Sequence, residues 1–325
     1  MARDVQPSAG PQATGWVWDE LFLKHTLSPG HPESPLRLSA IAAQMERSGL
    51  AAKVTPIAER VEPAEHILAL HSQAHCASVS ACPITGAVAA EAVARVLGAV
   101  RAVQQGRLRN AFCAVRPPGH HAHNNGADYD GRGEGQGFCF YDNVAIAARF
   151  AQRALGCRRV LICDWDYHYG NGTAWFFRAD PSVFVFSTHN FYTYPGTGDP
   201  SYRGEGAGLG CTLNVHLDSG ATDTDIAAAW DRRLLPGLEA AAFVPDIVLL
   251  SAGFDSRVDD TLGSFVITDA GYAELTRKAM AIAQRYCGGR LVSVLEGGYN
   301  VDGLAAAVCA HVATLAGLDW RTYVR

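Results

Sequence analysis

Short apolar runs alternate with helix-length segments through most of this chain, and that alternation restricts the fold more than any other feature. The apolar runs predict strands at 111–115, 159–163, 183–187, 212–217, 246–251 and 290–295. The periodic segments predict helices at 143–154, 223–241, 269–286 and 302–316. Such alternation is typical of βαβ units, in which helices cover both faces of a mainly parallel sheet. The sequence therefore predicts an α/β fold.

The N-terminal third is expected to belong to the same domain. It predicts a short strand or turn at 15–21, an ordered proline-rich loop at 25–35, a strand at 54–57 and helices at 37–48, 63–70, 72–79 and 87–105. No linker or internal repeat divides the chain. We therefore expect a single domain over 1–325, with a loose polar tail at 1–13.

Composition and charge argue against several classes of protein. The 325 residues carry 27 Lys and Arg against 32 Asp and Glu, a net charge of −5 with no basic block, so neither nucleic acid nor an anionic membrane is an expected partner. No signal peptide or transmembrane span is expected. The nine cysteines are scattered without a C-x-x-C pair, which favours reduced core residues of a cytoplasmic protein over a structural zinc cluster.

The apolar run at 160–163 breaks directly into acids, a histidine and glycines. Asp164, Asp166 and His168 lie two residues apart, so an extended chain would point all three side chains to one side. Two carboxylates and an imidazole at a strand end suit a divalent cation. Taken alone, the pattern fits a solvated Asp/His loop equally well.

Other polar residues follow apolar runs in the same way. His120 and His121 come after the run at 111–115, Asp255 comes after the run at 246–251, and Tyr299 comes after the run at 290–295. Each has an ordinary explanation, because histidine pairs are common in loops, Gly-Gly-Tyr turns often pack the ring and an Asp after a strand often caps a helix. Parallel strands, however, bring their carboxyl ends to one edge of the sheet, where ligands bind. The coincidence favours a metal site.

The side chains predicted at this edge suffice for metal-assisted hydrolysis of an amide. Asp166, His168 and Asp255 can serve as three ligands of one ion. Three protein ligands would leave a position open for water and substrate. One of His120 and His121 can accept a proton from water while the other protonates the leaving group. Tyr299 can donate a hydrogen bond to a developing oxyanion, and Asp164 and Asn171 can orient the two histidines.

A set of motifs covers nearly the whole chain. They are H-P-E-S-P-L-R at 31–37, R-P-P-G-H-H-A at 116–122, G-F-C-F-Y-D-N at 137–143, D-W-D-Y-H-Y-G-N-G-T at 164–173, Y-P-G-T-G at 194–198, S-A-G-F-D at 251–255 and E-G-G-Y-N at 296–300. In type and order they resemble the zinc-dependent histone deacetylase family. The resemblance is nearest to its bacterial class II-like deacetylases and acetylpolyamine amidohydrolases.

This resemblance implies the three-layer arginase/deacetylase fold, with a mainly parallel sheet of about eight strands. It implies one zinc ion per chain on the three ligands above, with His120 and His121 as the acid–base pair and Tyr299 as the residue that polarises the carbonyl. The residues that it implies for an acyl-lysine tunnel are Phe138, Tyr194, Gly137 and Gly297. It also implies a structural potassium ion, held largely by main-chain oxygens near Asp164, Asp166, His168, Ser187 and Thr188.

The sequence departs from the family pattern at four places. Tyr169 replaces a second histidine, for which we expect altered packing behind the metal, and Tyr194 replaces a phenylalanine of the tunnel wall. The segment 123–136 is a longer insert, and its acids are expected near the rim of the site: Asp128, Asp130 and Glu134. The segment 80–90 lacks the acid that the family often uses to grip the substrate backbone, which leaves room for a small amine substrate.

Three functions follow from these observations. The first is zinc-dependent hydrolysis of an N-acyl amide, either in acyl-lysine or in an acylated polyamine, and an acidic rim would attract such a cationic substrate. The second is a catalytically weak acyl-lysine binder or partner protein of the same fold. The third, a two-manganese ureohydrolase, is disfavoured because no second acid lies two residues after Asp255. A homo-oligomer is a further partner that the sequence leaves open.

Overall fold

The computed structural model describes residues 13–124 and 136–325. The predicted tail lies outside the described residues apart from Ala13. Most of the predicted insert also lies outside them, including the acids expected at the rim: Asp128, Asp130 and Glu134.

An eight-stranded sheet, in which every neighbouring pair is parallel, forms the centre of the molecule in the order β2-β1-β3-β8-β7-β4-β5-β6. The strands are β1 (Thr14–Val17), β2 (Thr55–Pro56), β3 (Asn110–Cys113), β4 (Val160–Asp164), β5 (Val183–His189), β6 (Thr212–His216), β7 (Ile247–Ala252) and β8 (Leu291–Leu295). Every residue of β4, β5, β7 and β8 is buried. This burial on both faces explains why these strands are continuous apolar runs in the sequence.

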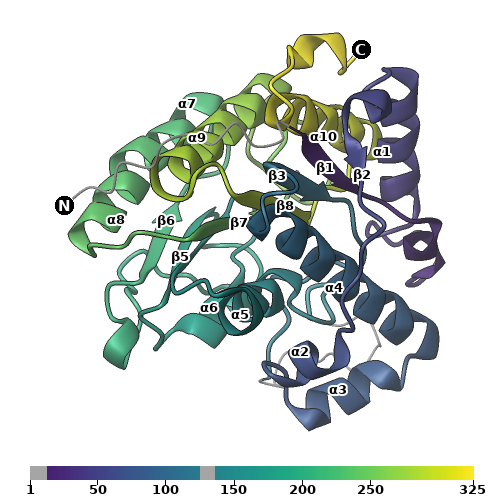
Figure 1. Ribbon diagram of the computed structural model, residues 1–325. Helices are drawn as coiled ribbons and strands as arrows, with labels where there is room; N and C mark the ends of the chain where they lie inside the picture. The colour runs from purple at the N-terminus through teal and green to yellow at the C-terminus, as the bar shows by residue number, and fades with distance from the viewer. Residues whose placement is uncertain (1–12, 125–135) are drawn as a thin grey trace.

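Helices cover both faces of the sheet, as the sequence predicted. They are α1 (Leu36–Arg47), α2 (Ala64–Leu68), α3 (Gln73–Ser80), α4 (Pro83–Gln104), α5 (Asn143–Leu155), α6 (Asn171–Phe177), α7 (Asp223–Ala229), α8 (Leu235–Ala240), α9 (Asp269–Cys287) and α10 (Val301–Leu315). α1, α7, α9 and α10 lie on one side of the sheet, and α4, α5 and α6 lie on the other (Figure 1). The predicted three-layer α/β architecture is therefore confirmed.

Several element boundaries differ from the prediction. α6 was not predicted, because glycines on either side of Asn171 hide a seven-residue helix. The helix predicted at 223–241 is interrupted by a π-helical turn at Trp230–Leu234. Pro236 at the start of α8 explains this break, since proline has no N–H to continue the α-helical hydrogen bonds. The first strand ends at Val17 and is followed by a 3₁₀ turn.

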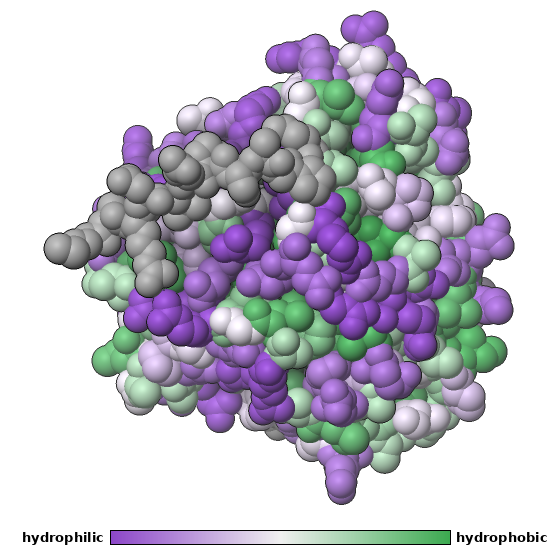
Figure 2. All heavy atoms as spheres, viewed as in Figure 1, coloured by the Kyte–Doolittle hydropathy of each residue, from purple (hydrophilic) through white to green (hydrophobic). Residues whose placement is uncertain are grey.

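α4 has the length and composition of a membrane span, although no span was expected from the sequence. By length and composition it is apolar enough to cross a bilayer, and it is the one such helix among the described residues. Just over half of its apolar window, 56%, is buried, and it packs against α5 and β3, as the core helix of a globular fold does. Hydrophobic residues on the described part of one face lie in small groups among hydrophilic ones (Figure 2).

The order of the strands positions the candidate site. β3, β8, β7 and β4 are consecutive neighbours in the sheet, and all four run in the same direction. Their carboxyl ends therefore meet at one edge. The predicted metal ligands, the histidine pair and Tyr299 lie in the segments that follow these four strands.

Candidate metal centre and active site

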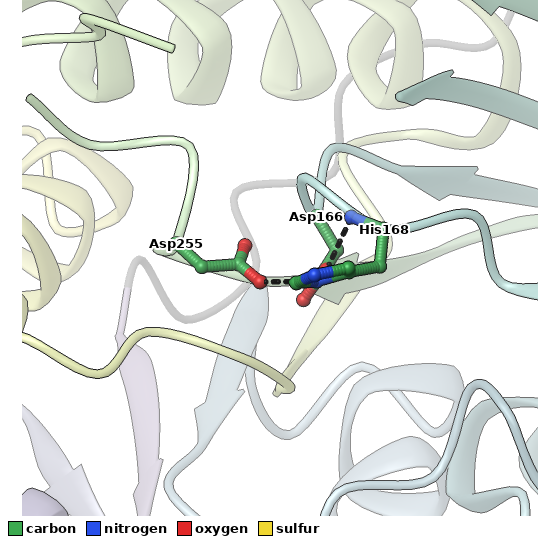
Figure 3. A group of neighbouring side chains, drawn as sticks. All are labelled: Asp166, His168 and Asp255. Atoms are coloured by element: carbon green, nitrogen blue, oxygen red, sulfur yellow. Dashed lines mark hydrogen bonds and ion pairs between the residues drawn. The ribbon is translucent and has the colours of Figure 1, made fainter. Parts of the chain in front are cut away.

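The three predicted metal ligands come together at this edge. Asp166 and His168 follow β4, Asp255 follows β7, and one potential ligand atom from each lies within 4.8 Å of the others (Figure 3). The Nδ1 atom of His168 lies 2.8 Å from Oδ2 of Asp255 and 3.3 Å from Oδ1 of Asp166. Residues 87 positions apart in the sequence are thus brought into one group.

Backbone N–H groups hold both carboxylates in place. Asp166 accepts hydrogen bonds from the N–H of His168 (2.8 Å) and of Gly297 (2.9 Å), and Asp255 accepts one from Tyr167 (2.9 Å). Two glycines allow the backbone to pass this close. A Cβ on Gly253 would lie 2.0 Å from Oδ2 of Asp166, and one on Gly297 would lie 2.5 Å from Oδ2 of Asp255. Side chains larger than hydrogen would displace the carboxylates.

The chemistry of this group fits a divalent cation. Burial opposes ionisation of Asp166, but the positive charges of His120 and His168 outweigh it and hold the pKa of Asp166 well below its usual range. Burial and the neighbouring Asp166 raise the pKa of Asp255 to about 7. Two carboxylates this close and fully buried repel one another unless a positive charge lies between them. Oxygen and imidazole donors at this spacing are suitable ligands for zinc.

The two histidines follow β3 and differ in their partners. Nδ1 of His120 lies 2.9 Å from Oδ2 of Asp164, and Nδ1 of His121 lies 2.8 Å from Oδ1 of Asn171. An amide oxygen only accepts hydrogen bonds, so Nδ1 of His121 carries the proton and its Nε2 has the free lone pair. The two rings are 4.0 Å apart.

The same partners move the pKa values of the two histidines in opposite directions. Burial disfavours the charged form of His120, but the charges of Asp166, Asp164 and Glu296 outweigh this effect and raise its pKa well above the usual value. Burial, reinforced by the charges of His120 and His168, lowers the pKa of His121 well below it. Neighbouring groups with opposite shifts are suited to act as an acid and a base.

Glu296 fixes the turn that carries the histidines, a role that the sequence did not reveal. Its Oε2 accepts hydrogen bonds from the N–H of Gly119 (2.7 Å) and of His120 (3.2 Å), and its Oε1 accepts one from the hydroxyl of Ser251. Burial raises the pKa of Glu296 to about 7. The carboxylate thereby ties the end of β8 to the turn after β3.

Tyr299 follows β8 in a turn that glycine makes possible. Gly298 has φ +119°, a conformation that residues with a side chain rarely adopt. Arg37 donates from Nε to the carbonyl of Gly298 (2.6 Å), and its guanidinium lies 5.1 Å from the centre of the Tyr299 ring. Burial and the charge of Asp255 raise the pKa of Tyr299 well above its usual value, so the phenol keeps its proton and can donate a hydrogen bond.

A buried ionic cluster supports the turn of Tyr299 through Arg37. Glu33, on the proline-rich loop that the sequence predicted to be ordered, bonds to Nη1 of Arg37 (3.0 Å) and to Nε and Nη2 of Arg116 (2.5 and 2.7 Å). His25 lies 3.2 Å from the same carboxylate, and all four side chains are fully buried. The charged residues within the motifs at 31–37 and 116–122 were the available signal, but their partners were not predictable from the sequence.

The predicted tunnel residues also lie beside the site. Gly137 has φ +51°, and a Cβ there would lie 2.5 Å from the His121 ring and 2.7 Å from the Tyr194 ring. The ring of Phe138 is 6.0 Å from that of Tyr299, and the ring of Tyr194 is 5.0 Å from that of His121. Tyr194 is 44% exposed, so this wall reaches the surface.

Three of the residues predicted near a potassium ion lie on the adjacent strands β4 and β5: Asp164, Ser187 and Thr188. Asp164 at the end of β4 pairs in register with Ser187 of β5. The buried hydroxyl of Thr188 makes no hydrogen bond within the part of the chain that the structure describes. Tyr169, where the family pattern has a histidine, packs its ring 4.6 Å from that of His189 and accepts a hydrogen bond from Asn214 (3.4 Å).

Comparisons with known proteins agree with this fold. The family model of the histone deacetylase domain matches residues 31–315, and the chain belongs to the histone deacetylase family. It is 35% identical to "Histone deacetylase 5" of Arabidopsis thaliana over 93% of its length, although it spans only 48% of that protein. It is 34% identical to a "Probable deacetylase" of Archaeoglobus fulgidus, covering 94% of this chain and 87% of the relative.

A solved structure supports the same assignment. The crystal structure of the "HDA15 HD domain" superimposes on this fold with a TM-score of 0.84 at 33% sequence identity, covering 94% of this chain and 88% of that one. The likeness therefore extends over most of the chain.

Proposed function

We propose that this protein is a zinc-dependent deacylase that hydrolyses an N-acyl amine, either an acyl-lysine side chain or an acylated polyamine. The observation that carries the proposal is that three sets of side chains converge at one edge of the sheet. They are the metal-ligand group of Asp166, His168 and Asp255, the His120–His121 pair, and Tyr299. Membership of the histone deacetylase family supports hydrolysis of an acetylated group.

Asp166, His168 and Asp255 would hold one zinc ion per chain. Two carboxylates and one imidazole are ligands that zinc accepts in catalytic sites, where three protein ligands leave a position open. When bound, zinc supplies Lewis acidity that acidifies water and polarises an acyl oxygen.

The protein's own residues move the protons. Nε2 of His121 accepts a proton from the attacking water, because the Asn171 hydrogen bond keeps its Nδ1 protonated and the lowered pKa keeps the ring neutral. His120, whose pKa is raised in part by Asp164, carries a proton that it can give to the leaving amine. The C–N bond then breaks to release a free amine and a carboxylate.

Tyr299 would stabilise the charge that develops on the acyl oxygen. Its phenol keeps its proton and can donate a hydrogen bond to that oxygen in the transition state. Phe138 and Tyr194 would contact the apolar stem of the substrate on opposite sides, and glycine at 137 and 297 would let it pass close to the backbone.

The other two functions are less well supported. Among the described residues, one group of His, Cys, Asp or Glu has metal-ligand spacing, which favours one ion over the pair that a ureohydrolase needs. Tyr299 and both histidines are present with suitable protonation, which favours catalysis over binding alone.

Substitution of the phenol tests the mechanism. Tyr299→Phe should retain one zinc per chain and lose roughly 100- to 1,000-fold in kcat, the usual effect of removing one oxyanion donor. Wild-type turnover of acetyl-lysine peptides and acetylated polyamines, measured with and without a chelator, identifies the substrate class. Near-normal turnover by Tyr299→Phe would overturn the mechanism, and inactivity of the zinc-loaded wild type on every acylated amine would favour a binding protein.

A structural potassium ion is a further part of the proposal. The register pairing of Asp164 with Ser187 and the unsatisfied buried hydroxyl of Thr188 support an ion near these residues, with Asp166 and His168 contributing main-chain oxygens. A rise in melting temperature with K⁺ that Li⁺ does not reproduce is the expected result, since a bound ion stabilises the folded state.

A further inference from the structure

One half-buried carboxylate, Asp260, accepts hydrogen bonds from four backbone N–H groups on two different segments. Its Oδ1 accepts from its own loop, at Leu262 (2.8 Å) and Gly263 (3.2 Å). Its Oδ2 accepts from the turn after β8, at Tyr299 (2.7 Å) and Asn300 (3.2 Å). Asp260 therefore joins the loop after β7 to the turn that carries the proposed catalytic phenol.

The loop on which Asp260 stands is itself fixed. The backbone N–H of Asp260 donates to the carbonyl of Arg257 (3.1 Å), and the Arg257 side chain bonds to Asp269 at the start of α9 (2.9 Å). Gly263 allows this loop to lie directly over the metal-ligand segment, since a Cβ there would come within 1.7 Å of the carbonyl oxygen of Asp255. The carboxylate is thus held between two anchored segments.

Asp260 completes the set of contacts around the turn. Arg37 holds the carbonyl groups of Glu296 and Gly298 on one side (2.5 and 2.6 Å). The N–H of Tyr299 points the other way and is held by Asp260. A backbone fixed on both sides leaves the phenol little freedom to move, and a displacement of about 1 Å in a catalytic group can cost roughly 100-fold in rate.

We propose that Asp260 is a positioning residue that holds Tyr299 in its catalytic place by binding its backbone N–H. This inference rests on the proposed function, in which Tyr299 stabilises the oxyanion. The role requires a carboxylate, because four N–H donors need acceptors on both oxygens. An asparagine has the same shape but only one oxygen, so its NH₂ group must face N–H donors on one of the two segments.

The test uses the full-length, zinc-loaded protein with four forms besides wild type: Asp260→Asn, Tyr299→Phe, the double variant and Asp259→Asn. Asp259 is the matched control, because it is the adjacent acid and its carboxylate bonds to Arg257 rather than to the turn. Its φ of +74° is a conformation that asparagine tolerates. We would measure kcat, KM, zinc content and amide hydrogen exchange over residues 296–303.

Asp260→Asn should lower kcat about 10- to 100-fold, leave KM within about threefold and retain one zinc per chain. Exchange at the Tyr299 and Asn300 amides should be faster than in wild type, whereas Asp259→Asn should match wild type in both respects. The double variant should be no more than about twofold slower than Tyr299→Phe, because Asp260 acts only through the phenol.

Three results would overturn the inference. The first is a kcat for Asp260→Asn within about twofold of wild type. The second is that Asp260→Asn lowers kcat by the same factor in the wild type and in Tyr299→Phe, because its effect would then lie at the metal site rather than at the phenol. The third, measurable on wild type alone if Asp260→Asn did not fold, is rapid exchange at the Tyr299 amide.

Failure of the proposed function would look different. Wild type would then hydrolyse no acylated amine, or Tyr299→Phe would retain normal turnover. The contact between Asp260 and the Tyr299 amide could still be tested in that case. Faster exchange at this amide in Asp260→Asn would support the contact, and exchange as slow as in wild type would refute it.

Discussion

Replacing Glu33 with glutamine should destabilise the protein strongly, although the change is nearly isosteric. Glu33 is fully buried and is the shared partner of Arg37, Arg116 and His25. Glutamine would leave two buried guanidinium groups without their counter-charge and would point an NH₂ group toward other donors. Removing one partner of a buried ion pair costs about 3–5 kcal/mol.

This free energy converts to a melting temperature through the size of the chain. Unfolding entropy of about 2.1 cal/mol/K per residue, over 325 residues, is about 0.7 kcal/mol/K. A loss of about 3–5 kcal/mol should therefore lower Tm by roughly 4–7 °C. Because Arg37 also holds the turn of Tyr299, kcat should fall in the same variant.

Thermal unfolding of the zinc-loaded protein measures the effect, with Glu239→Gln as the matched control. Glu239 pairs with Arg285 at 3.0 Å, but both side chains are more than half exposed, so its loss should lower Tm by no more than about 1.5 °C. If Glu33→Gln melted within about 1 °C of wild type, the buried cluster would not stabilise the fold as argued.

Three further predictions concern pH, the histidine pair and the metal ligands. Arg116, His25 and Arg37 outweigh the effect of burial on Glu33 and lower the pKa of its carboxyl group. The stabilisation that Glu33 gives the fold is therefore present above the unfolded-state pKa of 4.5 and is lost as the pH falls below that value. The Tm difference between wild type and Glu33→Gln should therefore shrink below about pH 4.5, and a constant difference down to pH 3 would contradict this. Asn171→Asp places a carboxylate beside Nδ1 of His121 and should raise the pKa of His121. The acid limb of the kcat/KM profile against pH should then move up by roughly one to two pH units. An unshifted limb would exclude His121 as the base. Gly297→Ala would bring a Cβ within 2.7 Å of both ligand carboxylates and should weaken zinc binding roughly 10- to 100-fold in a chelator competition, whereas unchanged affinity would show that the backbone moves aside.

The layers of the fold and the residues of the site were largely predictable. Buried parallel strands are continuous apolar runs, and their ends are marked by abrupt changes to polar residues. The six apolar runs therefore located β3 to β8, together with the polar residues after four of them, and the predictions at 15–21 and 54–57 overlap β1 and β2. The unpredicted α6 and the π-helical turn at Trp230–Leu234 are short and lie where glycine or proline obscures the helical period. The single-domain assignment, the cytoplasmic location and the identity of any homo-oligomer stay predictions.

By itself the sequence determined the alternation of strands and helices and the kinds of side chain placed at one sheet edge, because periodicity and turn chemistry are local properties. Only the tertiary structure decided which groups support that edge. Arg37 binds a carbonyl 261 positions away, and Asp260 binds an amide 39 positions away, and both partners are backbone atoms that every residue possesses. No residue type marks such a contact in advance, since it is packing of the sheet and its loops that brings the partners together.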